Sequence, residues 1–242
     1  MKLLMVFLLV LSLLGIGAFA QTDTGNVQIN LGTADKFALL GASGITNTSA
    51  QTYIIGDVGS YPTPAITGLK QSQVSGHLYL QSNLVTAEAQ KGLAVAYDEA
   101  ADAPCGTDLT GKDLGAMKLI PGVYCFSSSA GLTGTLTLDA HGNPNPQWIF
   151  QIGTTLTTAT SSKVVLNLSG KGGRGCNVYW QVGSSATVGT KSTFVGIIMA
   201  SKSITLNGGV LRGKALASHG AVTMSTQETV NGLICSTTPK TR

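Results

Sequence analysis

The side chains that usually carry chemistry are sparse and scattered in this chain. Only 11 of the 242 residues are acidic, and no motif of the serine-hydrolase nucleophile elbow occurs. Asp98, Glu99 and Asp102 are close in sequence, but they fall on a predicted helix, where a solvated face is the expected role. The three histidines lie far apart, without the spacing of metal ligands: His77, His141 and His219. The sequence therefore predicts no enzyme activity, no bound metal and no cofactor.

Hydroxyl side chains, in contrast, recur at regular intervals. The period is 18 residues between Thr187, Thr205 and Thr223, and it is longer where loops intervene. A period near 18 with alternating β-branched and apolar residues predicts a β-solenoid whose coils each contain three short strands. Glycines at fixed offsets suit the corners of such coils, where the backbone bends sharply: Gly196, Gly213 and Gly232.

One continuous core is expected inside the stacked coils. The residues expected to point inward are Ile204, Leu206, Leu211, Leu216, Val222 and Val230. Residues 84–101 interrupt the repeat, because their apolar residues recur at helical spacing and Pro104 follows. The many alanines predict a slim helix that can lie close to a flat sheet. We thus expect a mainly β fold with one long helix.

The N-terminus has the features of a secretory signal peptide. Lys2 is followed by an apolar stretch too short to span a bilayer, and Ala18-Phe19-Ala20 is a small-x-small cleavage site. We expect residues 1–20 to be removed, residues 21–242 to form a single domain, and the protein to be secreted. No second apolar stretch is long enough for a membrane span.

Composition excludes further classes of function. Charged residues make up only 11% of the chain, and the net charge of +4 comes from scattered lysines and arginines. Without a basic stripe that alternates with aromatic residues, nucleic-acid binding is not expected. Four cysteines in a secreted chain favour disulfides, and three pairings are open. Of these we favour Cys105–Cys125 with Cys176–Cys235.

Several segments resemble one known family. They are residues 31–40 (LGTADKFALL), 56–59 (GDVG), 121–124 (PGVY), 134–139 (GTLTLD), 148–152 (WIFQI) and 181–187 (QVGSSAT). Together with the order of coils, helix and coils, they resemble the microbial ice-binding (antifreeze) proteins of the DUF3494 type. The resemblance implies a right-handed parallel β-helix of triangular cross-section, a helix packed along one face, and interleaved coils from before and after the helix. It also implies adsorption to ice through a flat exposed face, and inhibition of ice growth and recrystallisation.

Two sets of hydroxyl residues compete for that face. The first set follows one strand of each coil, with smaller residues two positions earlier that could instead serve helix packing: Thr133, Thr157, Thr187, Thr205 and Thr223, after Gly131, Thr155, Ser185, Ser203 and Ala221. The second set lies at the next corner and strand, and it is the preferred ice-binding site: Ser49, Thr52, Thr135, Thr137, Thr190, Thr193, Asn207, Val210, Thr226 and Thr229. It is preferred because residues 49–52 (SAQT) match the family pattern of Thr, Ala or Gly, any residue, then Thr or Asn, with Ser for the first Thr. Lys163, Lys191, Arg212 and Glu228 place charge near this second set.

Two alternative functions remain open. Parallel β-helices also carry polysaccharide-cleaving enzymes and glycan-binding proteins, so the fold alone does not decide the function. A module that holds cells to ice or to matrix is the other alternative. The expected partner is an ice crystal surface, with neither nucleic acid nor membrane, and the expected state is a monomer, because a dimer through the flat face would hide that face.

Overall fold

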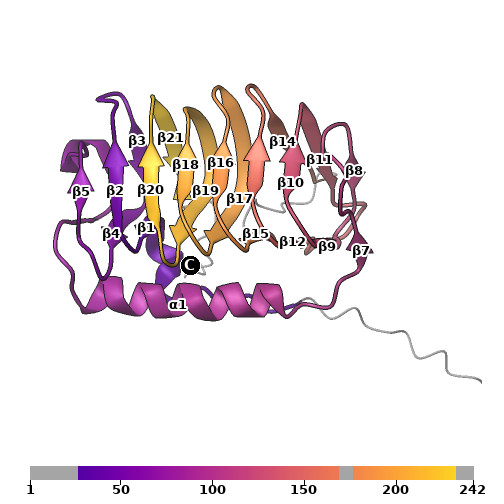
Figure 1. The fold of residues 1–242 in the computed structure, drawn as a ribbon, viewed down its shortest axis with the longest axis horizontal. Helices are drawn as coiled ribbons and strands as arrows, with labels where there is room; N and C mark the ends of the chain where they lie inside the picture. Colours follow the sequence, from indigo (N-terminus) through magenta and orange to yellow (C-terminus); the bar gives the residue numbers. More distant parts are fainter. Residues whose placement is uncertain (1–26, 169–176, 233–242) are drawn as a thin grey trace, which may run out of the picture.

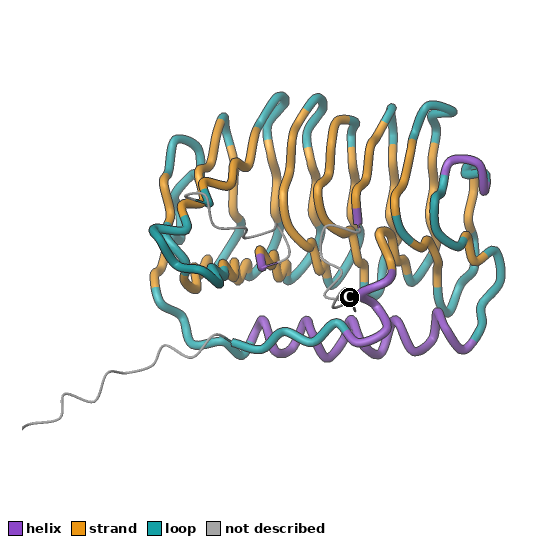
Figure 2. Tube along the Cα trace, turned by 180° about the vertical axis from the view of Figure 1, so that it is seen from behind, coloured by secondary structure: helices purple, strands orange, loops and turns teal. Residues whose placement is uncertain are grey.

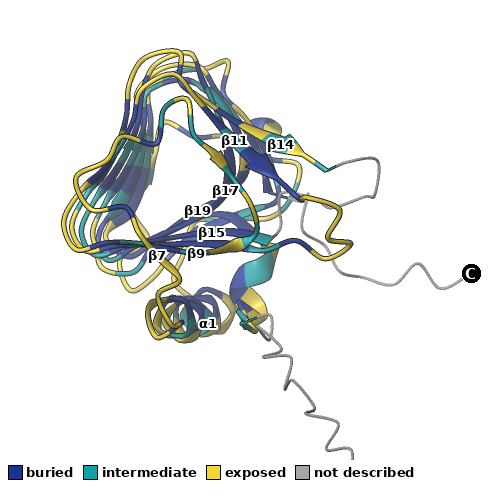
Figure 3. Ribbon diagram, turned by 90° about the vertical axis from the view of Figure 1, so that its right-hand side faces the viewer, coloured by how far each residue is buried: buried dark blue, intermediate teal, exposed yellow. Residues whose placement is uncertain are grey.

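The computed structural model describes residues 27–168 and 177–232. They form a parallel β-solenoid with a triangular cross-section and one long helix beneath it (Figures 1 and 3). The expected signal peptide, Cys176 and Cys235 lie outside the described residues. Within the described ranges, no helix combines the length and hydropathy needed to cross a membrane.

The solenoid has three faces, and the chain of each coil passes along them one after the other. The first, which we call the helix face, contains β1 (Phe37–Gly41), β4 (Asp57–Ser60), β6 (Leu78–Tyr79), β7 (Thr107–Asp108), β9 (Gly122–Phe126), β12 (Trp148–Ile152), β15 (Val178–Val182) and the second halves of β17 (Ser192–Ala200) and β19 (Gly209–Ala217). The second, the open face, is a seven-stranded sheet of β10 (Ala130–Leu132), β13 (Leu156–Thr158), β16 (Ala186–Val188), β18 (Ile204–Leu206), β20 (Ala221–Met224), β2 (Gly44–Asn47) and β5 (Ile66–Thr67).

The third face carries Lys118, Lys163 and Arg212, and we call it the charged face. It contains β8 (Lys118–Leu119), β11 (Thr135–Asp139), β14 (Lys163–Asn167), the first halves of β17 and β19, β21 (Glu228–Asn231) and β3 (Tyr53–Ile55). Two short 3-10 helices, η1 (Gly32–Lys36) and η2 (Gln71–Gln73), complete the secondary structure. Short turns join the faces, as the view from behind shows (Figure 2).

Glycine makes the sharp corner between the charged face and the helix face. Gly196 and Gly213 stand in the middle of β17 and β19, pair with each other, and have φ angles of 119° and 155°. A Cβ atom on Gly213 would lie 1.8 Å from the carbonyl oxygen of Gly196. The expectation of corner glycines at these two positions is confirmed, because both the backbone conformation and the close stacking exclude a side chain.

The coils from before the helix do not interleave with those from after it. β1 pairs with β19, β2 with β20 and β3 with β21, so the N-terminal coils stack as a block on the last C-terminal coil. The helix α1 (Leu84–Ala101) then runs back along the solenoid to the opposite end, where β7 and β9 begin the C-terminal coils (Figure 1). The expected interleaving was therefore wrong: the two sets are continuous blocks joined end to end.

The core lies in two layers. Inside the solenoid, apolar residues from all three faces meet, and the rings of Phe150 and Trp180 stack 3.9 Å apart on neighbouring coils. Between the helix face and α1, a second cluster includes Leu40, Ile149 and Leu216. All six expected core residues are buried, but Leu216 points outward to this second layer because the helix covers its face.

The helix has the predicted bounds, and its attachment explains why it lies flat. Asn83 caps it by accepting a hydrogen bond of 3.0 Å from the Thr86 backbone N–H. Ala89, Leu93, Ala96 and Ala100 form its buried side. Small alanine side chains let the helix axis approach the sheet closely.

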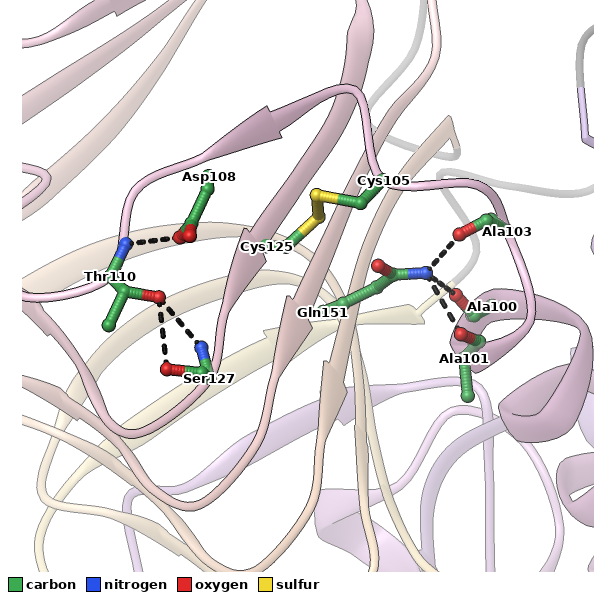
Figure 4. Close-up of a disulfide and its surroundings, with 9 residues drawn as sticks. All are labelled: Ala100, Ala101, Ala103, Cys105, Asp108, Thr110, Cys125, Ser127 and Gln151. Atoms are coloured by element: carbon green, nitrogen blue, oxygen red, sulfur yellow. Dashed lines mark hydrogen bonds between the residues drawn. A yellow bond between two sulfur atoms is a disulfide. The ribbon is translucent and has the colours of Figure 1, made fainter.

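At its other end, the helix is tied to the first C-terminal coils. The Gln151 side-chain amide donates to the carbonyl oxygens of Ala100, Ala101 and Ala103, at 2.9, 3.0 and 2.6 Å (Figure 4). The disulfide between Cys105 and Cys125 then joins the segment after the helix to β9, which confirms that half of the favoured pairing.

Candidate functional site

The open face carries an unbroken row of threonines. Six strands place a threonine in register with the next, and we call this set the threonine row: Thr157, Thr187, Thr205, Thr223, Thr46 and Thr67. Neighbouring strands of a sheet lie about 4.8 Å apart, so the row repeats at that spacing along the solenoid. All six side chains point to solvent, those of Thr157 and Thr67 being the most exposed.

The row is held rigidly from within. On the open-face strands β13, β16, β18 and β20, the residues on either side of the row are buried, as Ile204 and Leu206 are around Thr205. The β-branch of threonine limits its χ1 angle in addition. The result is a regular array of methyl and hydroxyl groups that is ordered before any partner arrives.

The open face is also uncharged. None of its seven strands contains a lysine, arginine, aspartate or glutamate. The positions two residues before the row are small, with Thr155, Ser185, Ser203 and Ala221 on successive strands or at their start. A surface of small, neutral groups is flat and holds no strongly bound hydration shell around a charge.

Two sequence expectations about this face need correction. Gly131, not Thr133, is in register with Thr157, so Thr133 lies two residues farther on, towards the corner. The helix packs on β1, β12 and β15, which belong to the helix face. The idea that the small residues of the first set serve helix packing was therefore wrong, and Figure 1 shows the open face uncovered above the helix.

The row includes two threonines that the sequence reasoning did not place in it. Thr46 and Thr67 lie on β2 and β5, before the helix, and they continue the row beyond Thr223. Thr46 belongs to a segment that matches the repeat, so it could have been found. The strand around Thr67 has only two residues, and such a short segment carries no recognisable repeat.

The second set of hydroxyl residues lies on the charged face and at its corner, among residues of other types. Thr135, Thr193, Val210 and Thr229 do share one row, as expected, but Lys163 and Tyr53 belong to it as well. The full row is Thr135, Lys163, Thr193, Val210, Thr229 and Tyr53. Thr137 stands in the next row, beside Lys118 and Val165. A lysine and a tyrosine within the row make this surface uneven.

Ser49 and Thr52 do not take the expected places in this set. Tyr53, rather than Thr52, is in register with Thr229. The Thr52 side chain is buried and donates a 2.8 Å hydrogen bond to Oδ1 of Asn47. The apparent match of residues 49–52 to the family pattern is thus offset by one residue from the neighbouring coils, and Thr52 turns inward.

The remaining members of the second set line the corner between the open and charged faces. Thr190 and Thr226 are exposed, and Asn207 is half-buried. Thr226 Oγ1 donates to the Asn207 carbonyl oxygen at 2.6 Å, while the Asn207 side-chain oxygen accepts from Ser225 Oγ at 2.7 Å. The Thr226 hydroxyl and the Asn207 side chain thus help to hold neighbouring turns together.

Among the described residues, no group of three or more histidines, cysteines and carboxylates could hold a metal ion. A groove of about 430 Å³ lies between the helix and the coil corner at Ser218 and His219. The His219 ring nitrogen Nδ1 lies 3.0 Å from the Ser201 carbonyl oxygen, so it is not paired with a serine hydroxyl.

Comparisons with known proteins agree with this geometry. A family model described as Ice-binding-like matches residues 39–231. An ice-binding protein from Nostoc sp. (strain HG1) is 44% identical over 237 residues, which are 97% of this chain and 85% of that protein. The crystal structure of an ice binding protein from an Antarctic Biological Consortium has a TM-score of 0.78 at 38% identity, covering 85% of this chain and 92% of the other. A glycosylated ice-binding protein from Arctic yeast has a TM-score of 0.77 at 29% identity, covering 90% and 98%.

Proposed function

Because this chain belongs to the Ice-binding-like family, we propose that it adsorbs to ice crystals and thereby inhibits their growth and recrystallisation. The threonine row on the open face is the surface that the geometry favours for this contact. The choice of the open face rests on one observation: six threonines stand in register on consecutive strands of a sheet that has no charged residue in its strands and is not covered by the helix.

The physical argument rests on order and on the absence of charge. Ice presents a periodic array of water, so a protein surface that binds it must position water at a matching repeat. Stacked strands repeat at about 4.8 Å, and alternate residues along a strand at about 6.7 Å, both near repeats of the ice lattice. Since the array is already rigid, little conformational entropy is lost on contact with a solid.

The second set of hydroxyl residues stays a competing proposal for the ice contact. Its strongest support is the row that holds Thr135, Thr193 and Thr229 on alternate strands of the charged face. Lys163 and Tyr53 interrupt and end that row. Charged and bulky groups oppose a close fit to a flat crystal plane, which is why we rank this face second.

The protein would act outside the cell, as a monomer and without catalysing a reaction. Secretion is supported by the sequence of residues 1–20, and lack of catalysis by the scattered acidic residues. A monomer leaves the open face free, whereas a symmetric dimer through that face would cover the threonine row. Elution at twice the monomer mass in a sizing experiment would contradict this part of the proposal.

The decisive experiment compares matched tyrosine substitutions on the two faces. Thr187→Tyr and Thr205→Tyr place a bulky ring on the threonine row, while Thr193→Tyr and Thr229→Tyr do so on the charged face. Ice-crystal shaping and recrystallisation inhibition are measured for each purified protein, and thermal unfolding confirms that each variant is folded. We expect loss of activity only in the first pair.

Other outcomes identify the alternatives. Loss in only the second pair would move the ice contact to the charged face. A folded wild-type protein that leaves crystals round and grain growth unchecked would contradict ice binding altogether. The solenoid would then be screened for glycan binding, polysaccharide cleavage and adhesion to matrix.

A further inference from the structure

Asp113 stands at the end of the threonine row. Its backbone forms a parallel bridge with Gly131, and Gly131 is the β10 residue in register with Thr157. The line of outward positions therefore runs from Asp113 through Gly131 to the six threonines. At this end, an acidic residue and a glycine occupy the places where the repeat elsewhere has threonine.

The Asp113 carboxylate is held in a fixed position. Oδ1 accepts hydrogen bonds from the backbone N–H groups of Gly115 and Thr133, at 2.7 and 2.9 Å, and Oδ2 accepts from Thr133 Oγ1 at 3.0 Å. Partial burial opposes ionisation, but the three hydrogen bonds outweigh it and hold the pKa of Asp113 below its usual value. The group is thus a fixed negative charge at neutral pH.

The glycine at position 131 makes room for this charge. A Cβ atom on Gly131 would lie 3.0 Å from Oδ2 of Asp113, which is closer than ordinary side-chain contacts. Gly131 has no positive φ angle, so its backbone would accept another residue. Space for the carboxylate, and not backbone conformation, is what a side chain at this position would disturb.

We propose that Asp113 sets the boundary of the ice-binding surface: its carboxylate lies over Gly131, in line with the threonine row, and ends the surface at Thr157. This inference rests on the proposed function and on the choice of the open face. A carboxylate orients the surrounding water around its own charge, which conflicts with the periodic order that the neutral array supports. The active row is thereby limited to six threonines, although the sheet has seven strands.

The test lengthens the row by one coil. The variants are Asp113→Ala, Gly131→Thr and the double variant, with Asp113→Asn as a neutral replacement of nearly the same shape. The readouts are thermal hysteresis at equal protein concentration and thermal unfolding. Asp108→Asn is the matched control, because Asp108 accepts a comparable 2.8 Å hydrogen bond from the Thr110 backbone N–H in the same terminal region, away from the row.

We expect the double variant to exceed the wild-type hysteresis at least in proportion to the change from six to seven threonines. Asp113→Asn should give a smaller increase, and Asp108→Asn none. Gly131→Thr alone should give no increase, because the new side chain meets the carboxylate. The inference is overturned if the double variant is folded but no more active than Asp113→Ala, or if Asp108→Asn and Asp113→Asn behave alike.

Thr205→Tyr in the same assay separates this inference from the proposed function. If Thr205→Tyr abolishes activity and the double variant is no more active than the wild type, the open face is still the ice contact, but the boundary role of Asp113 is wrong. If Thr205→Tyr is as active as the wild type, the open face is not the ice contact, and the proposed site itself is wrong.

Discussion

Lys214 donates a 3.0 Å hydrogen bond to the carbonyl oxygen of Gly232, although its side chain is only 1% exposed. The same ammonium group also donates to the Asp35 carbonyl oxygen and lies 3.4 Å from Oδ1 of Asp35. A single buried cation thus links the 3-10 helix η1 at the start of the fold to β19 and to the end of the last coil.

Replacing this lysine is expected to weaken the junction of the two blocks of coils. Lys214→Met keeps the volume of the side chain but leaves the Gly232 and Asp35 carbonyl groups without their donor. We expect a loss of about 2–3 kcal/mol in the free energy of unfolding, measured by thermal or denaturant unfolding. Lys202→Met, at an exposed lysine, is the control and should be nearly neutral.

Glu228 makes the stability of the fold dependent on pH. Its side chain is buried, which raises the pKa of Glu228 to about 7, although a hydrogen bond from the Gly208 backbone N–H acts in the opposite direction. Since the folded-state pKa lies above the unfolded value, the unfolded state releases its proton first. Stability is therefore greatest below the unfolded pKa and falls as the pH rises towards 7.

The Glu228→Gln variant should remove this dependence, because the amide oxygen still accepts from Gly208 and carries no charge. Above pH 7 we expect it to be more stable than the wild type by up to about 3 kcal/mol, and near pH 4 to differ little. Melting temperatures across this range provide the measurement. The exposed Glu88→Gln variant should follow the wild type, and an unchanged pH profile in Glu228→Gln would contradict the prediction.

The disulfide should stabilise the end of the solenoid where the helix joins it. Cys105 and Cys125 are 20 residues apart. Closing a loop of this size lowers the entropy of the unfolded chain and thereby stabilises the folded protein by about 3 kcal/mol. We expect the Cys105→Ala/Cys125→Ala variant to lose stability of this order. Hydrogen exchange should show the greatest loss of protection in β7 and β9, with little change in β2 and β20.

Substitutions at Thr205 can separate the contribution of its hydroxyl group to ice binding from the effect of an added charge. Thr205→Val keeps the shape and the methyl group of threonine, and we expect it to lose part of the activity. Thr205→Lys adds a long charged chain at the centre of the open face and should abolish most of it. Equal activity of the lysine variant and the wild type, measured as thermal hysteresis, would show that Thr205 does not touch ice.

The register between the C-terminal coils could be predicted from the sequence because their repeat is periodic, whereas the stacking of the N-terminal coils as a separate block was not predicted. The 18-residue spacing of Thr187, Thr205 and Thr223 fixes the register between coils, and helical spacing with a following Pro104 bounds the helix. The direction of Leu216 could not be predicted in the same way. An apolar residue in a strand is equally compatible with the solenoid interior and with a face that a helix covers.

The register of the irregular coils was harder to predict for a physical reason. A shift by one residue turns a side chain from one face of a strand to the other. The turn before β3 is one residue out of step with the turns before β17 and β21, so Tyr53 points outward and Thr52 inward. Likewise, the offset of Gly131 from Thr133 depends on loop length, which the residue pattern alone does not specify.

The order in which the coils are made differs from the order in which they are stacked. β2 and β5 are synthesised early, yet β2 has to pair with β20, whose residues come 177 positions later in the chain. Thr46 and Thr67 therefore reach their places only when synthesis is nearly finished. Until then, the edge of β2 that pairs with β20 in the folded protein has no partner strand. Such unpaired edges are prone to aggregation. A chain that terminates early would lack not only its last coil but also the continuity of the entire array.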